Sequence, residues 1–385
     1  MKKYPGVEPH GNGYRYSLYR GWVNGKKTYD KIGGFKTAQA AYRARCEAIR
    51  QLQTNTYIEP NKQTVEKYLT EWLAARAVDG TRYNTIKQYG WLVNRHAIPH
   101  LGHLELQKLS AQHIRGMYTK LLTRQPKPLS GTSVKHLHHM LHGAFAEAVN
   151  MDLMAKNPTD AIKAPQANHY EHQVWTKEEL ERFLEEARNE QYFIAFFLLG
   201  MSGARKAEMC GLQWSDVDLD AQCVYIRQSM VEKKGGIREL EDTKTHRSKR
   251  PVELDPYTIN ELRRHKIRQA EEKLMMGSDY QDHDLVICRR DGTPAPYTTI
   301  HKQFKRAIKH AGVPDIRPHD LRHTHATLLF QLKVPTKLVS DRLGHSRTAV
   351  TEDTYTHVIK EQRTEVAGQF GEAIFGQSEQ LKKRG

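Results

Sequence analysis

The sequence predicts a multidomain protein that is mostly α-helical and carries small β-sheets. The chain has 385 residues, more than one hydrophobic core usually holds. Long stretches repeat apolar residues with the period of amphipathic helices, and a few short segments alternate as strands do. Two polar stretches, 54–63 and 156–172, show neither pattern and contain prolines. They divide the chain into three predicted domains, 1–56, 62–165 and 170–385.

The first domain, 1–56, is expected to form a three-stranded sheet and one helix. The segment 13–23 alternates with period two, Asn24-Gly25 is a type I′ hairpin signal, and 26–35 returns as the next strand. Thr37 is placed to cap a helix over 38–53.

Positive charge is concentrated in this first domain. Residues 1–56 hold eleven Lys and Arg against three acids, in a chain of net charge +16 and isoelectric point about 9.5. This excess favours a polyanionic partner, and basic and aromatic residues alternate along a ribbon that could enter a DNA groove. We expect the Tyr and Trp side chains on one face to form the core. The opposite face is expected to bind DNA through Arg15, Arg20, Lys26 and Lys27.

The second domain, 62–165, reads as a compact helical bundle. Four segments show helical apolar spacing and begin at Thr or Ser, namely 64–77, 81–101, 110–122 and 130–154. The last contains His136, His138, His139 and His142, but no carboxylate or cysteine completes a metal site. The favoured interpretation is that these histidines lie on the helix surface near DNA phosphates, and no metal is expected.

The third domain, 170–385, mixes helices and strands. A capping box, Thr176 with Glu179, opens it, and the apolar run 193–201 is about half a membrane span and is read as a buried helix. Two or three antiparallel strands are predicted over 223–231, 236–245 and 248–254. Helices are expected over 256–275, 298–311, 318–332, 335–344 and 347–356, and a final amphipathic helix carries Val366, Phe370 and Ile374.

Composition excludes several classes of protein. Only 38% of residues are hydrophobic and the mean hydropathy is −0.73, so no membrane association is expected. No apolar stretch follows the basic N-terminus, which indicates a cytoplasmic protein. The four cysteines lie far apart, so neither a disulfide framework nor a cysteine zinc site is supported. They are expected to be buried thiols: Cys46, Cys210, Cys223 and Cys288.

The clearest chemical signal is the stretch 317–330, RPHDLRHTHATLLF. His319 and Arg322 are three residues apart and project from one side of a helical turn. Together they suit a phosphate group, because guanidinium donates paired hydrogen bonds and imidazole can exchange a proton. His345 follows a helix-ending glycine, and Tyr355 lies ten residues further on. Tyrosine, with a pKa of about 10, needs a base and nearby cations to act as a nucleophile.

Five motifs in this order resemble the tyrosine recombinases, the phage integrase family. They are ARKAE (204–208), TKT with RPVEL (243–245 and 250–254), HDLRHTHAT (319–327), LGHS (343–346) and DTYTH (353–357). The resemblance spans the whole chain and implies an arm-type DNA-binding domain, a SAM-like core-binding bundle and a mixed α/β catalytic domain. An alanine stands before the first arginine, where the family more often has leucine.

The resemblance implies a catalytic set, position by position. Arg205 matches the first arginine, Glu208 its supporting acid, and Lys244 the hairpin lysine, for which Lys233, Lys234 and Lys249 are alternatives. The remaining positions are His319, Arg322, His345 and the nucleophile Tyr355.

The implied activity is site-specific DNA recombination through a 3′-phosphotyrosine, with neither cofactor, metal nor ATP. The implied partners are double-stranded DNA at core and arm sites, a homotetramer whose C-terminal helix is exchanged, an excisionase and a host DNA-bending protein. Two alternatives stay open: a type IB topoisomerase, which would not need a basic arm domain, and a non-catalytic DNA-binding regulator. A metal-dependent nuclease is disfavoured because no Asp/Glu pair is placed for two cations.

Overall fold

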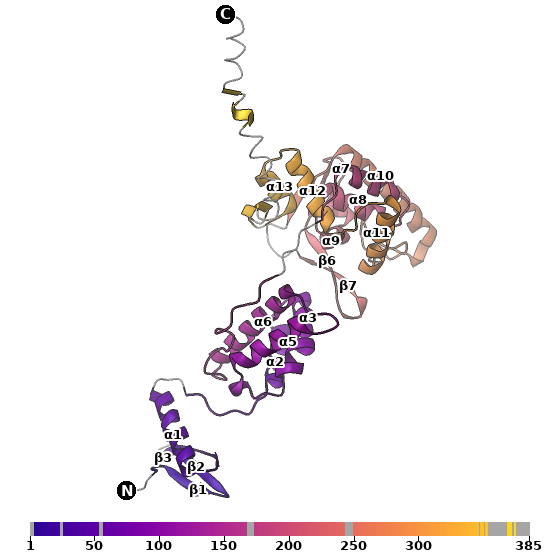
Figure 1. The fold of residues 1–385 in the computed structure, drawn as a ribbon. Helices are drawn as coiled ribbons and strands as arrows, with labels where there is room; N and C mark the ends of the chain where they lie inside the picture. Colours follow the sequence, from indigo (N-terminus) through magenta and orange to yellow (C-terminus); the bar gives the residue numbers. More distant parts are fainter. Residues whose placement is uncertain are drawn as a thin grey trace, which may run out of the picture. The chain divides into compact units, whose positions relative to one another are not determined.

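The computed structural model describes residues 4–23, 26–53, 57–167, 173–242, 249–345, 347–349, 351–352, 368–371 and 373–374. The chain divides into two compact units, Met1–His169 and Tyr170–Gly385. Helices dominate both units, and each also contains β-strands (Figure 1). The predicted fold class, multidomain and mostly α with small antiparallel sheets, is confirmed.

The N-terminal segment forms a three-stranded antiparallel sheet covered by a helix, as predicted. The strands are β1 (Val7–His10), β2 (Gly13–Val23) and β3 (Lys26–Phe35), in the order β1-β2-β3, followed by α1 (Ala38–Gln53). Thr37 accepts a hydrogen bond from the Ala40 amide at 3.2 Å and caps α1. Tyr16 and Leu18 are buried between sheet and helix.

The prediction that Tyr and Trp of this sheet form its core is wrong for Tyr19 and Trp22. Their exposed fractions are 44% and 64%. The pairing of β2 with β3 shifts register between Tyr19 and Gly21. A bulge adds a residue and reverses which side chains face the core. Trp22 therefore joins Tyr19 on the outer face, where Lys27 lies 5.6 Å from the centre of its ring.

The helical bundle follows the predicted segments. Its elements are α2 (Val65–Val78), α3 (Tyr83–Leu92), η1 (Val93–Ala97), α4 (Ile98–Leu101), α5 (Ala111–Thr123) and α6 (Gly131–Asn150). One difference is that the expected continuous helix over 81–101 contains a π-helical turn, η1, in which the Ile98 amide bonds to Val93. Pro99 has no N–H, which removes one α-helical hydrogen bond next to this turn.

In the C-terminal unit, helices pack around the apolar helix α8 (Phe193–Ser202). α7 (Lys177–Ala187) begins with the predicted capping box of Thr176 and Glu179. The other helices are α9 (Lys206–Cys210), α10 (Pro256–Met276), α11 (Tyr297–Ala311), α12 (Asp320–Gln331) and α13 (Thr336–Leu343). α8 contacts α7, α10 and α12, so its buried face fixes the position of the segment that follows Ser202 (Figure 1).

The strands of this unit form two small antiparallel sheets. One has the order β4-β5-β8, from β4 (Val217–Asp218), β5 (Cys223–Ile226) and β8 (Arg250–Glu253). The other pairs β6 (Gln228–Glu232) with β7 (Arg238–Asp242). The strand expected over 223–231 is therefore split, and the chain changes sheets at Arg227, whose guanidinium bonds to buried Asp216 at 2.8 Å.

Three further predictions, on the cysteines, the last two helices and membrane spans, can be compared with the structure. Cys46 is exposed, so it is not a buried thiol, whereas Cys210 and Cys223 are buried and Cys288 is intermediate. Of the last two expected helices, only 347–349, 351–352, 368–371 and 373–374 are described, and Val366 lies outside them. In the part of the chain that the structure describes, no helix has the length and apolar character needed to cross a bilayer.

Candidate functional site

The first predicted catalytic residue, Arg205, lies where α8 ends and α9 begins. Gly203 adopts a left-handed conformation (φ 65°) that terminates α8 and turns the chain. The guanidinium of Arg205 donates to Glu208 at 2.7 Å, and the backbone amide of Arg205 donates to the second carboxylate oxygen at 2.9 Å. The side chain stays 36% exposed. Glu208 thus fixes the position of Arg205, while part of the guanidinium side chain remains exposed to solvent.

Glu208, the partner of Arg205, is almost completely buried, with 4% of its side chain exposed. It also accepts a hydrogen bond from Arg250 Nη2 at 3.1 Å. Burial alone would raise the pKa of Glu208, but the charges of Arg250 and Arg205 outweigh it and lower the pKa. Glu208 is therefore an anion that orients two arginines.

His319 and Arg322 come from the start of α12, which packs on α8. Arg322 is 3% exposed and donates to the carbonyl of Gly203 at 2.8 Å, two residues before Arg205. The pKa of His319 is lowered by burial and by the charge of Arg322. His319 is then neutral near pH 7 and able to accept a proton.

His345 follows the left-handed residue Gly344 (φ 69°), which ends α13. Arg205 Nη2 donates to the Gly344 carbonyl at 3.1 Å, and His345 Nδ1 lies 2.7 Å from Thr351 Oγ1. Burial, followed by the charges of Arg322 and Arg205, lowers the pKa of His345 to about 4. The neutral imidazole is the stable form near pH 7.

The structure thus brings together four of the six predicted catalytic residues: Arg205, His319, Arg322 and His345. Two glycine carbonyls link them, because Arg322 binds Gly203 and Arg205 binds Gly344. Lys244 and Tyr355 lie outside the described residues. Of the alternative lysines, Lys233 pairs with Glu239 and Glu241, and Lys249 bonds to Asp242 at 2.9 Å.

Sequence reasoning missed two arginines and a histidine that support these residues. Arg250 bonds to Glu208 and, through Nε, to the Arg342 carbonyl at 2.7 Å. The Arg342 side chain donates to the backbone carbonyls of Met201 and Glu253 at 3.1 and 3.0 Å, and to His325 Nε2 at 3.1 Å. One signal in the sequence was available. Arg250 stands two residues before Val252, so the two side chains share the buried face of β8.

The predicted DNA-binding residues of the first domain are only partly free. Arg15 faces Glu8 of β1 in the register and bonds to its carboxylate at 2.5 Å. Lys26 and Lys27 are exposed at the start of β3, and Lys27 lies over Trp22. Arg20 lies within β2.

The histidine run of α6 does not lie wholly on a surface as expected. His138 is buried, with Nδ1 3.2 Å from the Tyr118 hydroxyl, and burial lowers its pKa. His142 lies 3.1 Å from Asp160. Over the described ranges, no three His, Cys, Asp or Glu side chains gather as metal ligands would.

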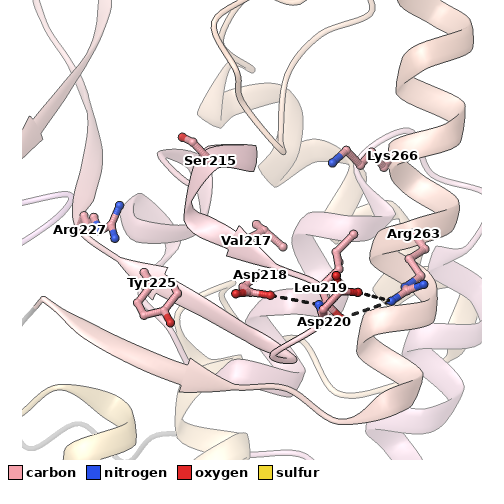
Figure 2. A pocket seen from close by; sticks show the side chains of 9 residues that line it. All are labelled: Ser215, Val217, Asp218, Leu219, Asp220, Tyr225, Arg227, Arg263 and Lys266. Carbon is pink, nitrogen blue, oxygen red and sulfur yellow. Dashed lines mark hydrogen bonds and ion pairs between the residues drawn. The ribbon is translucent and has the colours of Figure 1, made fainter.

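A separate hollow of about 470 Å³ lies between the β4–β5 hairpin and α10 (Figure 2). Its positive side chains already have partners: Arg227 bonds to Asp216 at 2.8 Å and Arg263 to Asp220 at 3.3 Å. Lys266 lies over the Trp214 ring at 5.1 Å. None of the predicted catalytic residues that the structure describes lines this hollow. The cationic centre built around Arg205 is therefore the candidate site.

Comparison with known proteins identifies the family. Residues 173–362 match the phage integrase family, and residues 64–122 match the phage integrase N-terminal SAM-like domain. The chain is 31% identical to a XerC-like tyrosine recombinase of Caldanaerobacter subterraneus, over 68% of this chain and 70% of that protein. The chain belongs to the phage integrase family. It is a tyrosine recombinase, and its activity is site-specific recombination of DNA, as the five motifs predict.

Solved structures of integrases share the fold. The integrase of transposon Tn1549, in complex with transposon right-end DNA, matches with a TM-score of 0.67 at 18% identity, over 79% of this chain and 99% of that chain. The lambda integrase, solved as a tetramer bound to a Holliday junction, matches with a TM-score of 0.53 at 20% identity, over 90% of this chain and 93% of that chain.

Proposed function

We propose that this recombinase cuts and rejoins DNA through a covalent bond between Tyr355 and a 3′-phosphate. The observation that carries this proposal is the convergence of two arginines and two histidines, Arg205, Arg322, His319 and His345, around one centre. Such a centre suits a phosphodiester, whose transition state gains negative charge on its non-bridging oxygens.

In the proposed cleavage step the Tyr355 hydroxyl attacks phosphorus and the bond from phosphorus to the 5′-oxygen breaks. Neutral His319 accepts the tyrosine proton, and Lys244 donates a proton to the leaving 5′-oxygen. Arg205 and Arg322 bind the non-bridging oxygens, and His345 donates a further hydrogen bond. A 5′-hydroxyl from a second duplex then reverses the step, so the ester conserves the bond energy and ATP is not consumed.

The guanidinium groups do here what divalent metals do in other phosphoryl-transfer enzymes, namely neutralise the transition state. Arg322 suits this role because its 3% exposed side chain is held by the Gly203 carbonyl before substrate arrives. A preorganised cation needs no rearrangement at the moment of reaction. We therefore propose that neither metal nor cofactor takes part.

Assembly on DNA is the second part of the proposal. We propose that 62–165 and 170–385 bind the core site, that 1–56 binds accessory arm sites, and that four copies act together, as in the lambda integrase tetramer. Because the activity needs DNA, we propose that it takes place in the cytoplasm. An excisionase and a host DNA-bending protein would set the direction of the reaction.

The test is covalent trapping on supercoiled plasmid in EDTA without ATP, with wild type beside Tyr355→Phe. We expect relaxed plasmid and an SDS-stable protein–DNA adduct from wild type alone, while the variant binds DNA equally well, because it lacks only the nucleophilic oxygen. An adduct from Tyr355→Phe would overturn the nucleophile. Cleavage that needs magnesium would replace the mechanism with a nuclease's, and relaxation without exchange at an attachment site would favour a topoisomerase.

A further inference from the structure

Arg250 is buried beside the candidate site, although no step of the proposed reaction uses it. It is the first residue of β8, and 6% of its side chain is exposed. Burying a guanidinium is unfavourable unless acceptors surround it. The acceptors of Arg250 belong to the segments that carry the catalytic residues.

Arg250 contacts α13, Glu208 and the turn at Gly344. Arg250 Nε donates to the Arg342 carbonyl at 2.7 Å, in the last turn of α13, and Nη2 donates to Glu208 at 3.1 Å. A Cβ atom added at Gly344 would lie 2.7 Å from Arg250 Nη1 and 2.9 Å from Cζ. Arg250 therefore lies directly against the backbone that leads into His345.

Arg205 reaches the same turn from the other direction. Its Nη2 donates to the Gly344 carbonyl, while its Nη1 binds Glu208. Glu208 and Gly344 are thus each contacted by both arginines. Arg205 retains exposed surface for a ligand, whereas Arg250 is covered.

We propose that Arg250 is a positioning residue of the recombination reaction, which fixes the turn carrying His345 and shares the Glu208 carboxylate with Arg205. This inference rests on the proposed function. In the proposed reaction Arg250 takes part in no bond that forms or breaks, and it acts on catalysis by holding His345 and Arg205 in register with the phosphate. Displacing a catalytic group by about 1 Å can cost on the order of 100-fold in rate.

The charge of Arg250 supplies a readout that a purely structural role would not move. Among the described residues, the charged groups that act on the His345 ring are Arg322 and His319 from α12, Arg205 beside α9 and Arg250 from β8. Thr351 lies at hydrogen-bond distance. Burial and these charges depress the pKa of His345. Removing one of the cations should therefore raise that pKa, whereas a substitution that keeps the charge should not.

The experiment compares Arg250→Met and Arg250→Lys with wild type, using the full chain at saturating DNA and well below each variant's unfolding midpoint. Single-turnover adduct formation and the pKa of His345, followed by NMR of its labelled ring, are measured. We expect Arg250→Met to lose roughly 10- to 100-fold in rate with a raised His345 pKa. Arg250→Lys should lose rate as well, because one ammonium cannot reach both acceptors, but should keep the wild-type pKa.

The matched control is Arg263→Met, which removes an arginine that is 53% exposed and bonded to Asp220 in the separate hollow (Figure 2). It should change neither quantity. A wild-type rate in Arg250→Met, or an equal pKa change in both Arg250 variants, would overturn the inference. If Arg250→Met does not fold, Arg250→Lys alone tests the inference, and a wild-type rate in that variant would overturn the positioning role. An adduct from Tyr355→Phe would instead refute the proposed function.

Discussion

The imidazole of His345 can donate a hydrogen bond to a phosphate oxygen only if its proton lies on Nε2. Thr351 can set this tautomer by donating, because its hydroxyl lies 2.7 Å from Nδ1 and the residue is fully buried. When Oγ1 donates, Nδ1 is the acceptor and the ring proton stays on Nε2. In the opposite arrangement Nε2 has no proton to offer. The role proposed for His345 therefore depends on a neighbouring hydroxyl.

Thr351→Val tests this dependence, because it keeps the shape of the side chain and removes the hydroxyl. We expect adduct formation to fall by roughly 10-fold or more, as for a weakened oxyanion donor, with DNA affinity unchanged. Thr351→Ser keeps the hydroxyl and should stay near wild type. Single-turnover trapping measures both, and a fully active Thr351→Val would mean that His345 needs no fixed tautomer.

At the scale of elements, the sequence predicted what local interactions decide. Thr64 and Thr176 cap α2 and α7, so these helices begin where the capping residues indicate. The split between β5 and β6 was not predictable from local alternation. At this point Arg227 bonds to Asp216, eleven residues earlier. Arg250 was missed for a similar reason. Its partner Glu208 is 42 residues away, and no local pattern marks such a contact.

Two helices end in the same way and provide a matched pair of substitutions. α13 ends at Gly344 (φ 69°) and α11 at Gly312 (φ 62°), both left-handed. A methyl group would meet Arg250 at Gly344, whereas it would meet nothing within 4 Å at Gly312. An alanine therefore has the same backbone cost at both positions, and only at Gly344 does it also contact Arg250.

We expect Gly312→Ala to destabilise the fold by about 1 kcal/mol, the backbone term alone. Gly344→Ala should cost more, about 2–4 kcal/mol, because Arg250 must also be displaced. It should slow adduct formation, whereas Gly312→Ala should not. Urea unfolding and single-turnover trapping measure the two effects. Equal losses of stability would show that the turn before His345 tolerates a side chain.

For the molecule as a whole, buried and partly buried neutral histidines couple stability to pH. In the C-terminal unit the pKa is lowered to about 4 for His265, about 3 for His325 and about 4 for His345, in each case first by burial. The unfolded chain binds a proton at each near pH 6.5. Between about pH 6.5 and 4 the unfolded state therefore holds more protons than the folded state, so stability falls as pH falls.

We therefore expect these histidines to leave the free energy of unfolding unchanged above about pH 7 and to decrease it below that pH, by up to about 1.4 kcal/mol per pH unit for each such histidine. Urea titrations at pH 7.5, 6 and 5, followed by circular dichroism and tryptophan fluorescence, measure the slope. His345→Asn removes one of the three groups and should show a shallower slope than wild type. His345 faces the DNA site. If DNA binding needs its neutral ring, saturating DNA should increase the loss of stability at low pH, and otherwise it should not. A slope of zero in wild type would mean that these histidines are protonated inside the fold, and His345 would then act as a cation.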